Sequence, residues 1–206
     1  MNDALITGAS SGIGYELAKL FAEKGNDVIL VARNKEKLAR LADDLEKAYS
    51  INAHTMDIDL GHPNAADEIF KRVQEKSVVV TYLVNNAGSF IKGPFTKTNW
   101  EEEQKMILMQ CLTHIRLTKL LLPGMLERGR GGILNVGSTG SFVPGPYNAV
   151  YCAAKSFVLS FSEALAEEVT PRKPCHDVVA QGTPADEPAH DDHREDQVLV
   201  AGVITL

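Results

Sequence analysis

Short runs of β-branched and other apolar residues alternate along this chain with longer segments whose apolar residues recur at helical spacing. The short runs predict strands at 4–7, 28–31, 54–56, 78–84 and 132–136. Strands that alternate with helices in this way are typical of a parallel sheet with helices on both faces. We therefore expect an α/β fold with a doubly wound parallel sheet.

The helical segments are marked by apolar residues on one face. Ile13, Leu17, Leu20 and Phe21 mark the first helix, and Gly25 ends it. The residues expected to face the core from the next two helices are Leu38, Leu41, Leu45, Ile69, Phe70 and Val73. A long helix is expected over 100–126, and another over 151–169.

Composition narrows the class of protein. The chain has 206 residues with 44% hydrophobic content, which suits a single domain over 1–206. Its net charge of −6 gives no reason to expect a nucleic acid partner or an anionic membrane. The longest uncharged apolar run is about half of a bilayer span, and the first residues do not read as a secretory signal, so no membrane segment is predicted.

Cysteine usage indicates the compartment. Cys111, Cys152 and Cys175 are odd in number and far apart, which is typical of packing thiols rather than of a disulfide framework. We therefore expect a reducing compartment and a cytoplasmic protein.

The stretch TGASSGIG, residues 7–14, lies where the first strand meets the first helix. Gly8, Gly12 and Gly14 allow a sharp turn and a close approach to a pyrophosphate, while the helix N-terminus offers free N–H groups. Ser10, Ser11 and Ile13 belong to the same stretch and are counted with the glycines as cofactor-binding residues. This arrangement predicts a dinucleotide site.

The end of the second strand indicates which dinucleotide is bound. Folds that bind NAD place a carboxylate there, but this chain has Ala32 and Arg33. The guanidinium of Arg33 is suited to pair with a 2′-phosphate, so NADPH is preferred over NADH. The alternative is that Arg33 is only a solvated residue at a strand end.

Tyr151 and Lys155 are four residues apart and therefore lie on one face of a helix. Hydride transfer to a carbonyl places negative charge on its oxygen, so a proton donor must lie within hydrogen-bond reach. A tyrosine can donate that proton, and a neighbouring ammonium stabilises the phenolate that remains. Ser138, after the fifth strand, would donate a second hydrogen bond to the substrate. The alternative is a helix pair and a helix cap without chemistry.

With NNAG after the fourth strand and YCAAK after the fifth, the chain resembles the short-chain dehydrogenase/reductase family in its single-domain, Rossmann-like form over residues 3–169. The resemblance implies that the glycines hold the pyrophosphate, and that Ser138, Tyr151 and Lys155 are catalytic. The further residues that it implies around the adenosine part of NADP are Asp59, Leu60, Asn86, Ala87 and Gly88. Tyr151 and Lys155 would also contact the cofactor.

The fourth helix departs from the family pattern at Gln110. The family usually has an asparagine there, which anchors a water and joins the proton relay to the lysine. Glutamine carries the same amide on a longer side chain, so Gln110 is counted as a catalytic residue whose hydrogen bonds depend on local geometry. We expect Cys111 and His114 to form no metal or nucleophile site, and His114 to be an interfacial helix residue.

The segment 170–206 is atypical, and the sheet is expected to be incomplete at its C-terminal edge. Ungapped register with the family places the sixth strand and its turn at 177–184, with Gln181 where a proline is usual and Asp186 where a threonine is usual. QVLVAGVITL would supply a last strand. AHDDHRED is interpreted as an acidic loop rather than a metal site. We hypothesise a C-terminus altered by frameshift, truncation or splicing.

The expected activity is NADP-dependent hydride transfer between the nicotinamide and a small-molecule carbonyl or alcohol substrate. One alternative is a cofactor-binding protein without turnover, because the substrate lid is lost; another is an unstable, nonfunctional product. The family commonly forms homodimers and homotetramers through its fourth and fifth helices, so LTHIRLTKLLL and KSFVLSFSEAL are candidate interfaces. Burial in the core explains their apolar residues almost as well.

Overall fold

The computed structural model describes residues 3–169 and the backbone of strand 198–204. The strands are β1 Asp3–Thr7, β2 Asp27–Ala32, β3 Ala53–Asp57, β4 Val80–Asn85, β5 Gly131–Val136 and β6 Val198–Ile204. The helices are α1 Gly12–Glu23, α2 Lys35–Tyr49, α3 Ala65–Glu75, α4 Trp100–Ile107, the π-helix η2 Leu108–Thr113, α5 His114–Glu127 and α6 Ala149–Val169. Two short 3-10 helices are η1 Phe95–Lys97 and η3 Thr139–Ser141.

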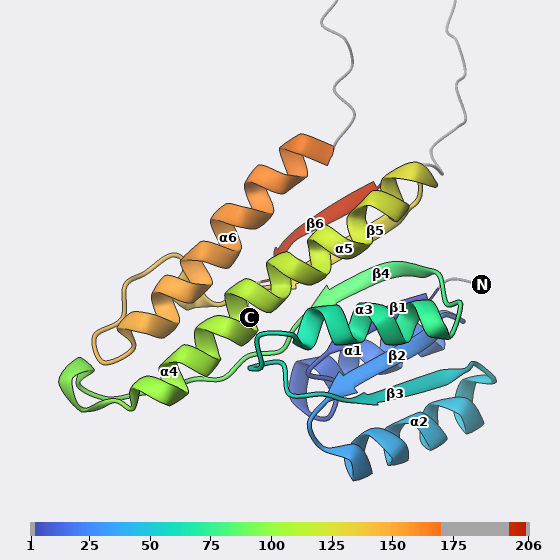
Figure 1. Cartoon of the computed structure of the whole chain (residues 1–206), viewed down its shortest axis with the longest axis horizontal. Helices are drawn as coiled ribbons and strands as arrows, with labels where there is room; N and C mark the ends of the chain where they lie inside the picture. The colour runs from blue at the N-terminus through green and yellow to red at the C-terminus, as the bar shows by residue number, and fades with distance from the viewer. Residues whose placement is uncertain (1–2, 170–197, 205–206) are drawn as a thin grey trace, which may run out of the picture.

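The strands form one parallel sheet in the order β3-β2-β1-β4-β5-β6, which confirms the doubly wound α/β fold (Figure 1). The chain moves outward from β1 to β3 in one direction and from β4 to β6 in the other. Ligands of such sheets bind beyond the carboxyl ends of the strands where the order reverses, here between β1 and β4.

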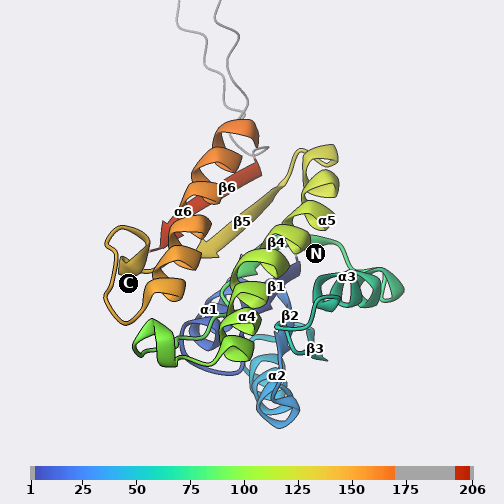
Figure 2. The ribbon, with the colours of Figure 1, turned by 60° about the vertical axis from the view of Figure 1, so that its left-hand side comes forward.

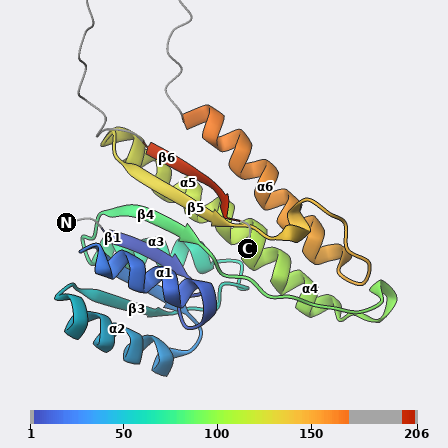
Figure 3. The ribbon, with the colours of Figure 1, turned by 180° about the vertical axis from the view of Figure 1, so that it is seen from behind.

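Helices cover both faces of the sheet (Figures 2 and 3). On one face, α1 and α2 pack against β1 and β2 through a cluster that includes Ile6, Leu30, Leu38 and Leu45. On the other face, α3 and α5 pack against the sheet through a second cluster that includes Leu83 and Ile133, with partly buried residues of α6 beside it. Every residue of β1 is buried, as expected of a central parallel strand.

The first helix is where predicted, but its buried face differs from the one predicted. Gly14, Ala18 and Ala22 are buried, whereas Ile13 and Leu20 are exposed. Small residues let α1 approach the sheet closely, while Leu17 and Phe21 are partly buried against the same cluster. The predicted core residues of α2 and α3 are confirmed, with Phe70 only partly buried.

The fourth strand begins at Val80, not at residue 78 as predicted. Ser77 has a left-handed backbone with φ 54°, and the Val78 N–H donates to the Val73 carbonyl at 3.3 Å. Residues 76–79 are therefore used to end α3. The predicted long helix is also interrupted, because six of its residues form the π-helix η2 between α4 and α5.

β6 confirms the predicted last strand and pairs with β5 in parallel. The family-like sixth strand expected at 177–184, with Gln181 and Asp186, lies outside the described residues, as do Cys175 and the acidic loop. No seventh strand lies within the described part of the chain. Cys111 and Cys152 are buried free thiols, as expected of packing cysteines.

Helix α6 is long and apolar enough, by length and composition, to cross a membrane. In the structure it packs against the sheet, where Lys155 and Ser162 are buried and form hydrogen bonds with residues of β5.

Candidate active site

A cavity of about 450 Å³ lies at the carboxyl ends of the strands, which is a common size for a small-molecule site. It brings together thirteen of the predicted site residues, which are Gly8, Ser10, Ser11, Ile13, Arg33, Asp59, Leu60, Asn86, Ala87, Gly88, Gln110, Tyr151 and Lys155. The described lining does not include Gly12, Gly14 or Ser138. Residues that sequence reasoning missed also line it, among them Asn34, Ser89, Phe90 and Met109.

The glycine turn fits an anionic group. Gly8 has φ +70°, and its N–H donates to the Val31 carbonyl at 2.8 Å, which fixes the turn against β2. Gly12 also has a positive φ, at the first residue of α1. The side chain of the N-cap residue Ser11 makes no capping hydrogen bond, so the first N–H groups of α1 are available to a ligand.

Gly14 has a packing role in the structure. A Cβ atom at Gly14 would lie 2.4 Å from both the Gly8 carbonyl oxygen and Asn86 Nδ2. Asn86 Nδ2 in turn donates to the Thr7 carbonyl at 2.9 Å, and Thr7 Oγ1 accepts from the Asn86 N–H at 2.9 Å. Only glycine at position 14 allows this close joining of the loops after β1 and β4. At Gly12 a Cβ atom would meet nothing within 4 Å, so glycine is favoured there by the positive φ alone.

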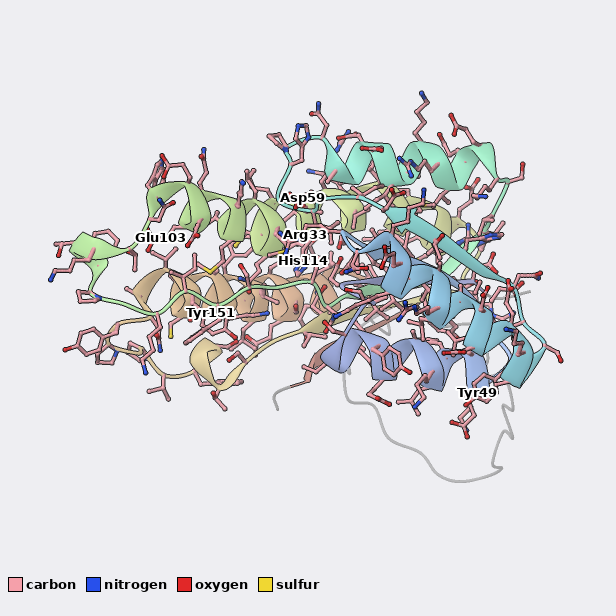
Figure 4. The ribbon with its side chains drawn as sticks, turned by 90° about the horizontal axis from the view of Figure 1, so that it is seen from below. Arg33, Tyr49, Asp59, Glu103, His114 and Tyr151 are labelled. Atoms are coloured by element: carbon pink, nitrogen blue, oxygen red, sulfur yellow. The ribbon has the colours of Figure 1, made fainter. Side chains whose placement is uncertain are left out.

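The ends of β2 and β3 form the other part of the cavity. Figure 4 shows Arg33 and Asp59 near each other at this edge. Arg33 is exposed and forms no ion pair with any described residue. Asp59 Oδ1 accepts from the Gly61 N–H at 3.0 Å, and the Leu60 carbonyl accepts from Thr113 Oγ1 at 2.9 Å. The Arg33 guanidinium, which has no ion-pair partner among the described residues, therefore lies at the strand end where the 2′-phosphate is predicted to bind.

Lys155 is a buried charged residue of the cavity. Its side chain lies within α6, and Nζ donates to the Val136 carbonyl at the end of β5 at 2.8 Å. The residue is only 4% exposed, and this burial lowers the pKa of Lys155 to about 8, although nearby Cys111 acts in the opposite direction. The ammonium is thus held against the end of β5.

Tyr151 is held by an aromatic contact and Ser138 by the backbone. The Tyr151 ring packs edge-on against Phe90, with centroids 4.9 Å apart. Ser138 Oγ accepts from the Gly140 N–H at 3.1 Å and so caps η3. A Cβ atom at Gly140 would lie 3.5 Å from Tyr151 Cε1 and 3.6 Å from Ser138 Oγ, so both side chains flank this glycine. Ser138 therefore stands beside Tyr151 although it does not line the cavity.

Gln110 lies in the π-helix η2, in which a wider turn brings Gln110, Cys111 and Thr113 into the interior together. Its Nε2 donates to the Ser89 carbonyl at 2.9 Å. Its Oε1 is buried and has no hydrogen-bond partner among the described residues. A Cβ atom at Gly88 would lie 3.3 Å from that oxygen, so the amide closes over the loop after β4.

His114, expected to be an interfacial helix residue, is buried inside the chain's own fold. It is 2% exposed, and burial, with a smaller contribution from the Lys155 charge, lowers the pKa of His114 to about 3. The sequence signal for this position is a polar residue at every fourth place, Gln110, His114 and Thr118. We find no group of three metal-ligating side chains within the described ranges.

Comparison with known proteins identifies the family of this chain. Residues 2–183 match the family model described as short chain dehydrogenase. The chain is 39% identical to a very-long-chain 3-oxoacyl-CoA reductase of Coccidioides immitis, over 82% of this chain and 49% of that protein. A protein of the same name from Phaeosphaeria nodorum is also 39% identical, over 82% of this chain and 50% of that protein. The chain spans about half the length of these curated relatives.

Two solved structures show the same fold. A short-chain dehydrogenase from Sphingobium yanoikuyae, in complex with NADPH, superimposes with a TM-score of 0.77 and 34% identity, over 82% of this chain and 65% of that one. The L-sorbose reductase of Gluconobacter frateurii, in complex with NADPH and L-sorbose, gives a TM-score of 0.76 and 32% identity, over 82% and 64%.

Proposed function

Because this chain belongs to the short chain dehydrogenase family, we propose that it is an NADP-dependent oxidoreductase that transfers a hydride between the nicotinamide and a carbonyl or alcohol substrate. The observation that carries the proposal is the single cavity that joins the glycine turn at Gly8 to Tyr151 and Lys155. Phosphate-binding and proton-transferring groups thus share one space.

The residues present fit NADPH. The turn at Gly8, with Ser10, Ser11 and the uncapped N-terminus of α1, would hold the pyrophosphate. Arg33 would pair with the 2′-phosphate, and Asp59 and Leu60 would flank the adenine. When bound, the cofactor supplies the hydride.

The proton chemistry belongs to the chain itself. Tyr151 would donate its hydroxyl proton to the substrate oxygen, while Ser138 would donate a hydrogen bond to the same atom. Lys155 would stabilise the resulting phenolate and contact the nicotinamide ribose through N–H groups that Val136 does not use. Because Lys155 is buried in α6, its charge acts where water screens it little.

The proposed substrate is an apolar 3-oxoacyl thioester. Exposed apolar side chains stand in the loops on both sides of Tyr151, namely Phe90, Phe142, Val143 and Tyr147. The two loops are joined, because the Gly93 N–H donates to the Tyr147 carbonyl at 2.9 Å. This apolar surface suits an acyl chain, and the names of the relatives from Coccidioides immitis and Phaeosphaeria nodorum support the same class.

A second candidate is a protein that binds NADPH without turnover. It is favoured by the sequence of residues 170–206, which has Gln181 and Asp186 where the family usually has a proline and a threonine. Titration with NADPH and NADH, followed by NADPH oxidation with a series of 3-oxoacyl thioesters, ketones and aldehydes, separates the two. Tight NADPH binding with turnover supports the reductase, and tight binding without turnover supports the second candidate. Absence of NADPH binding would refute both.

A further inference from the structure

A small cavity lies at the start of α6, next to the first turn that carries Tyr151. Its volume is about 30 Å³, which leaves room for about one water molecule. Ala149 and Val150 of α6 line it, together with Asn148, which precedes them, and Glu103 of α4. Figure 4 shows Glu103 and Tyr151 at the same end of the molecule. The cavity therefore joins α4 to the beginning of the helix that carries Tyr151.

The first turn of α6 is not capped by its own residues. Asn148 is the N-cap residue, because its carbonyl accepts from the Cys152 N–H at 2.9 Å. Its side-chain Oδ1, the usual capping acceptor, is buried and has no hydrogen-bond partner among the described residues. The N–H groups of Ala149, Val150 and Tyr151 also have no acceptor there, and the first turn contains no acidic residue. The positive end of the helix dipole is therefore not balanced from within α6.

Glu103 brings a buried carboxylate to the same cavity. The residue is 7% exposed, and its carboxylate forms no ion pair and no hydrogen bond with any residue that the structure describes. The described lining of the cavity contains no lysine, arginine or histidine. A carboxylate withdrawn from water needs a positively polarised partner. The partner that this lining offers is the N-terminus of α6.

The chain that leads into α6 is held in an unusual conformation. Tyr147 has a left-handed backbone with φ 66°, which is uncommon for a residue other than glycine. Its carbonyl accepts from the Gly93 N–H at 2.9 Å, so the loop is tied to the segment after β4. Such conformations persist only where the surrounding contacts hold them. The position of Tyr151, four residues later, therefore depends on the contacts made around this cavity.

We propose that the Glu103 carboxylate balances the positive end of α6 across this cavity, and that Glu103 is thereby a positioning residue for Tyr151. It takes the part that an acidic residue in the first turn takes in other helices. The alternative is that Glu103 serves only its own helix, whose first turn also contains Glu101 and Glu102. Helix α4 is already capped, because Asn99 Oδ1 accepts from the Glu102 N–H at 3.0 Å. The catalytic consequence rests on the proposed function, whereas the charge balance does not.

The charge balance is tested first by thermal unfolding of Glu103→Gln, which keeps the shape of the side chain and removes its charge. We expect the melting temperature to fall by about 2–4 °C. Glu102→Gln is the matched control, because it removes the same charge from the first turn of α4 at an exposed position. It should lower the melting temperature by less than about half as much. Equal falls would mean that Glu103 serves only α4, and they would refute the proposal.

A compensating variant separates the charge from packing. Asn148→Asp places a carboxylate at the N-cap of α6 itself. In the Glu103→Gln background it should return the melting temperature to within about 1 °C of the wild type. In the wild-type background it should give no such gain, because two carboxylates would then face the same cavity. The four proteins form a double-mutant cycle. An equal effect of Asn148→Asp in both backgrounds would show that Glu103 does not act on α6, and it would overturn the proposal.

The positioning role is tested by kinetics of the same four proteins with NADPH and a 3-oxoacyl thioester. In Glu103→Gln, kcat should fall about 3- to 10-fold, while Kd for NADPH stays within about twofold of the wild type. Asn148→Asp should restore kcat in that background. An unchanged kcat in Glu103→Gln, or a restored melting temperature without a restored kcat, would refute the positioning role. If the wild-type chain binds NADPH but shows no turnover, the proposed function fails, and the melting temperatures still decide on the charge balance.

Discussion

The Nζ atom of Lys155 lies 2.8 Å from the carbonyl oxygen of Val136, which fastens helix α6 to the end of strand β5. The bond holds a charged side chain that is only 4% exposed. The ammonium therefore stays close to Tyr151 at the cost of its hydration. That cost is measurable as a dependence of stability on pH.

Lys155→Met should remove a rise in stability at alkaline pH. The folded-state pKa of Lys155 is about 8, below the ordinary 10.5, so between these values the unfolded chain binds more protons. The wild-type free energy of unfolding should therefore rise from pH 8 to 10.5 relative to the variant, by roughly 3 kcal/mol in total. Urea denaturation at a series of pH values measures the difference, and parallel curves would contradict the burial of the charge.

His114→Phe should reduce sensitivity to acid. The folded-state pKa of His114 is about 3, below the ordinary 6.5, so the wild-type chain loses stability as pH falls from 6.5 toward 3. Relative to the variant, the loss should approach about 1.4 kcal/mol per pH unit. Thermal unfolding between pH 4 and 7 checks this. His62→Phe, at an exposed histidine, is the control and should keep the wild-type slope.

Much of this fold follows from patterns that act over short distances. Alternating strands and helices identify the parallel sheet. The glycine turn and the Tyr151–Lys155 spacing identify residues that line the cavity at the carboxyl ends of the strands. These features depend on local chain geometry, which the sequence determines directly.

The remaining features depend on contacts between segments distant in sequence. Gly12 and Gly14 look alike in sequence, but only Gly14 meets Asn86 from another strand's loop. The π-helix and the burial of His114 result from the packing of η2 against the β4 loop and α6. Apolar residues that recur every 3.6 residues predict an α-helix, and this pattern gives no sign of the wider turn of a π-helix.

Gly14→Ala should be more damaging than Gly12→Ala. A Cβ at Gly14 meets backbone and amide atoms at 2.4 Å, so the loops after β1 and β4 must separate, and NADPH binding should be lost. A Cβ at Gly12 meets nothing within 4 Å, so its cost is only that of a positive φ, about 1 kcal/mol. Melting temperature and NADPH titration of both variants compare the two. Equal losses would mean that the close contact has no special role.

Arg33→Ala should weaken NADPH more than NADH. Hydrogen bonds to charged groups contribute about 1.5–3 kcal/mol, so Kd for NADPH should rise roughly 10- to 150-fold while Kd for NADH changes little. Fluorescence titration with both nucleotides measures the ratio. Arg40→Ala, at an exposed arginine of α2 that does not line the cavity, is the matched control. Equal weakening of both nucleotides would remove Arg33 as the source of the preference.

The most direct test of the reductase proposal is the rate of NADPH oxidation with a 3-oxoacyl thioester, compared between the wild type and Tyr151→Phe. The variant keeps the ring that packs against Phe90 and loses only the hydroxyl. Tyr49→Phe, on α2 and away from the site (Figure 4), is the control with the same change. We expect kcat to fall at least about 100-fold in Tyr151→Phe, with Kd for NADPH nearly unchanged, and we expect Tyr49→Phe to keep the wild-type rate. Wild-type turnover in Tyr151→Phe would contradict it.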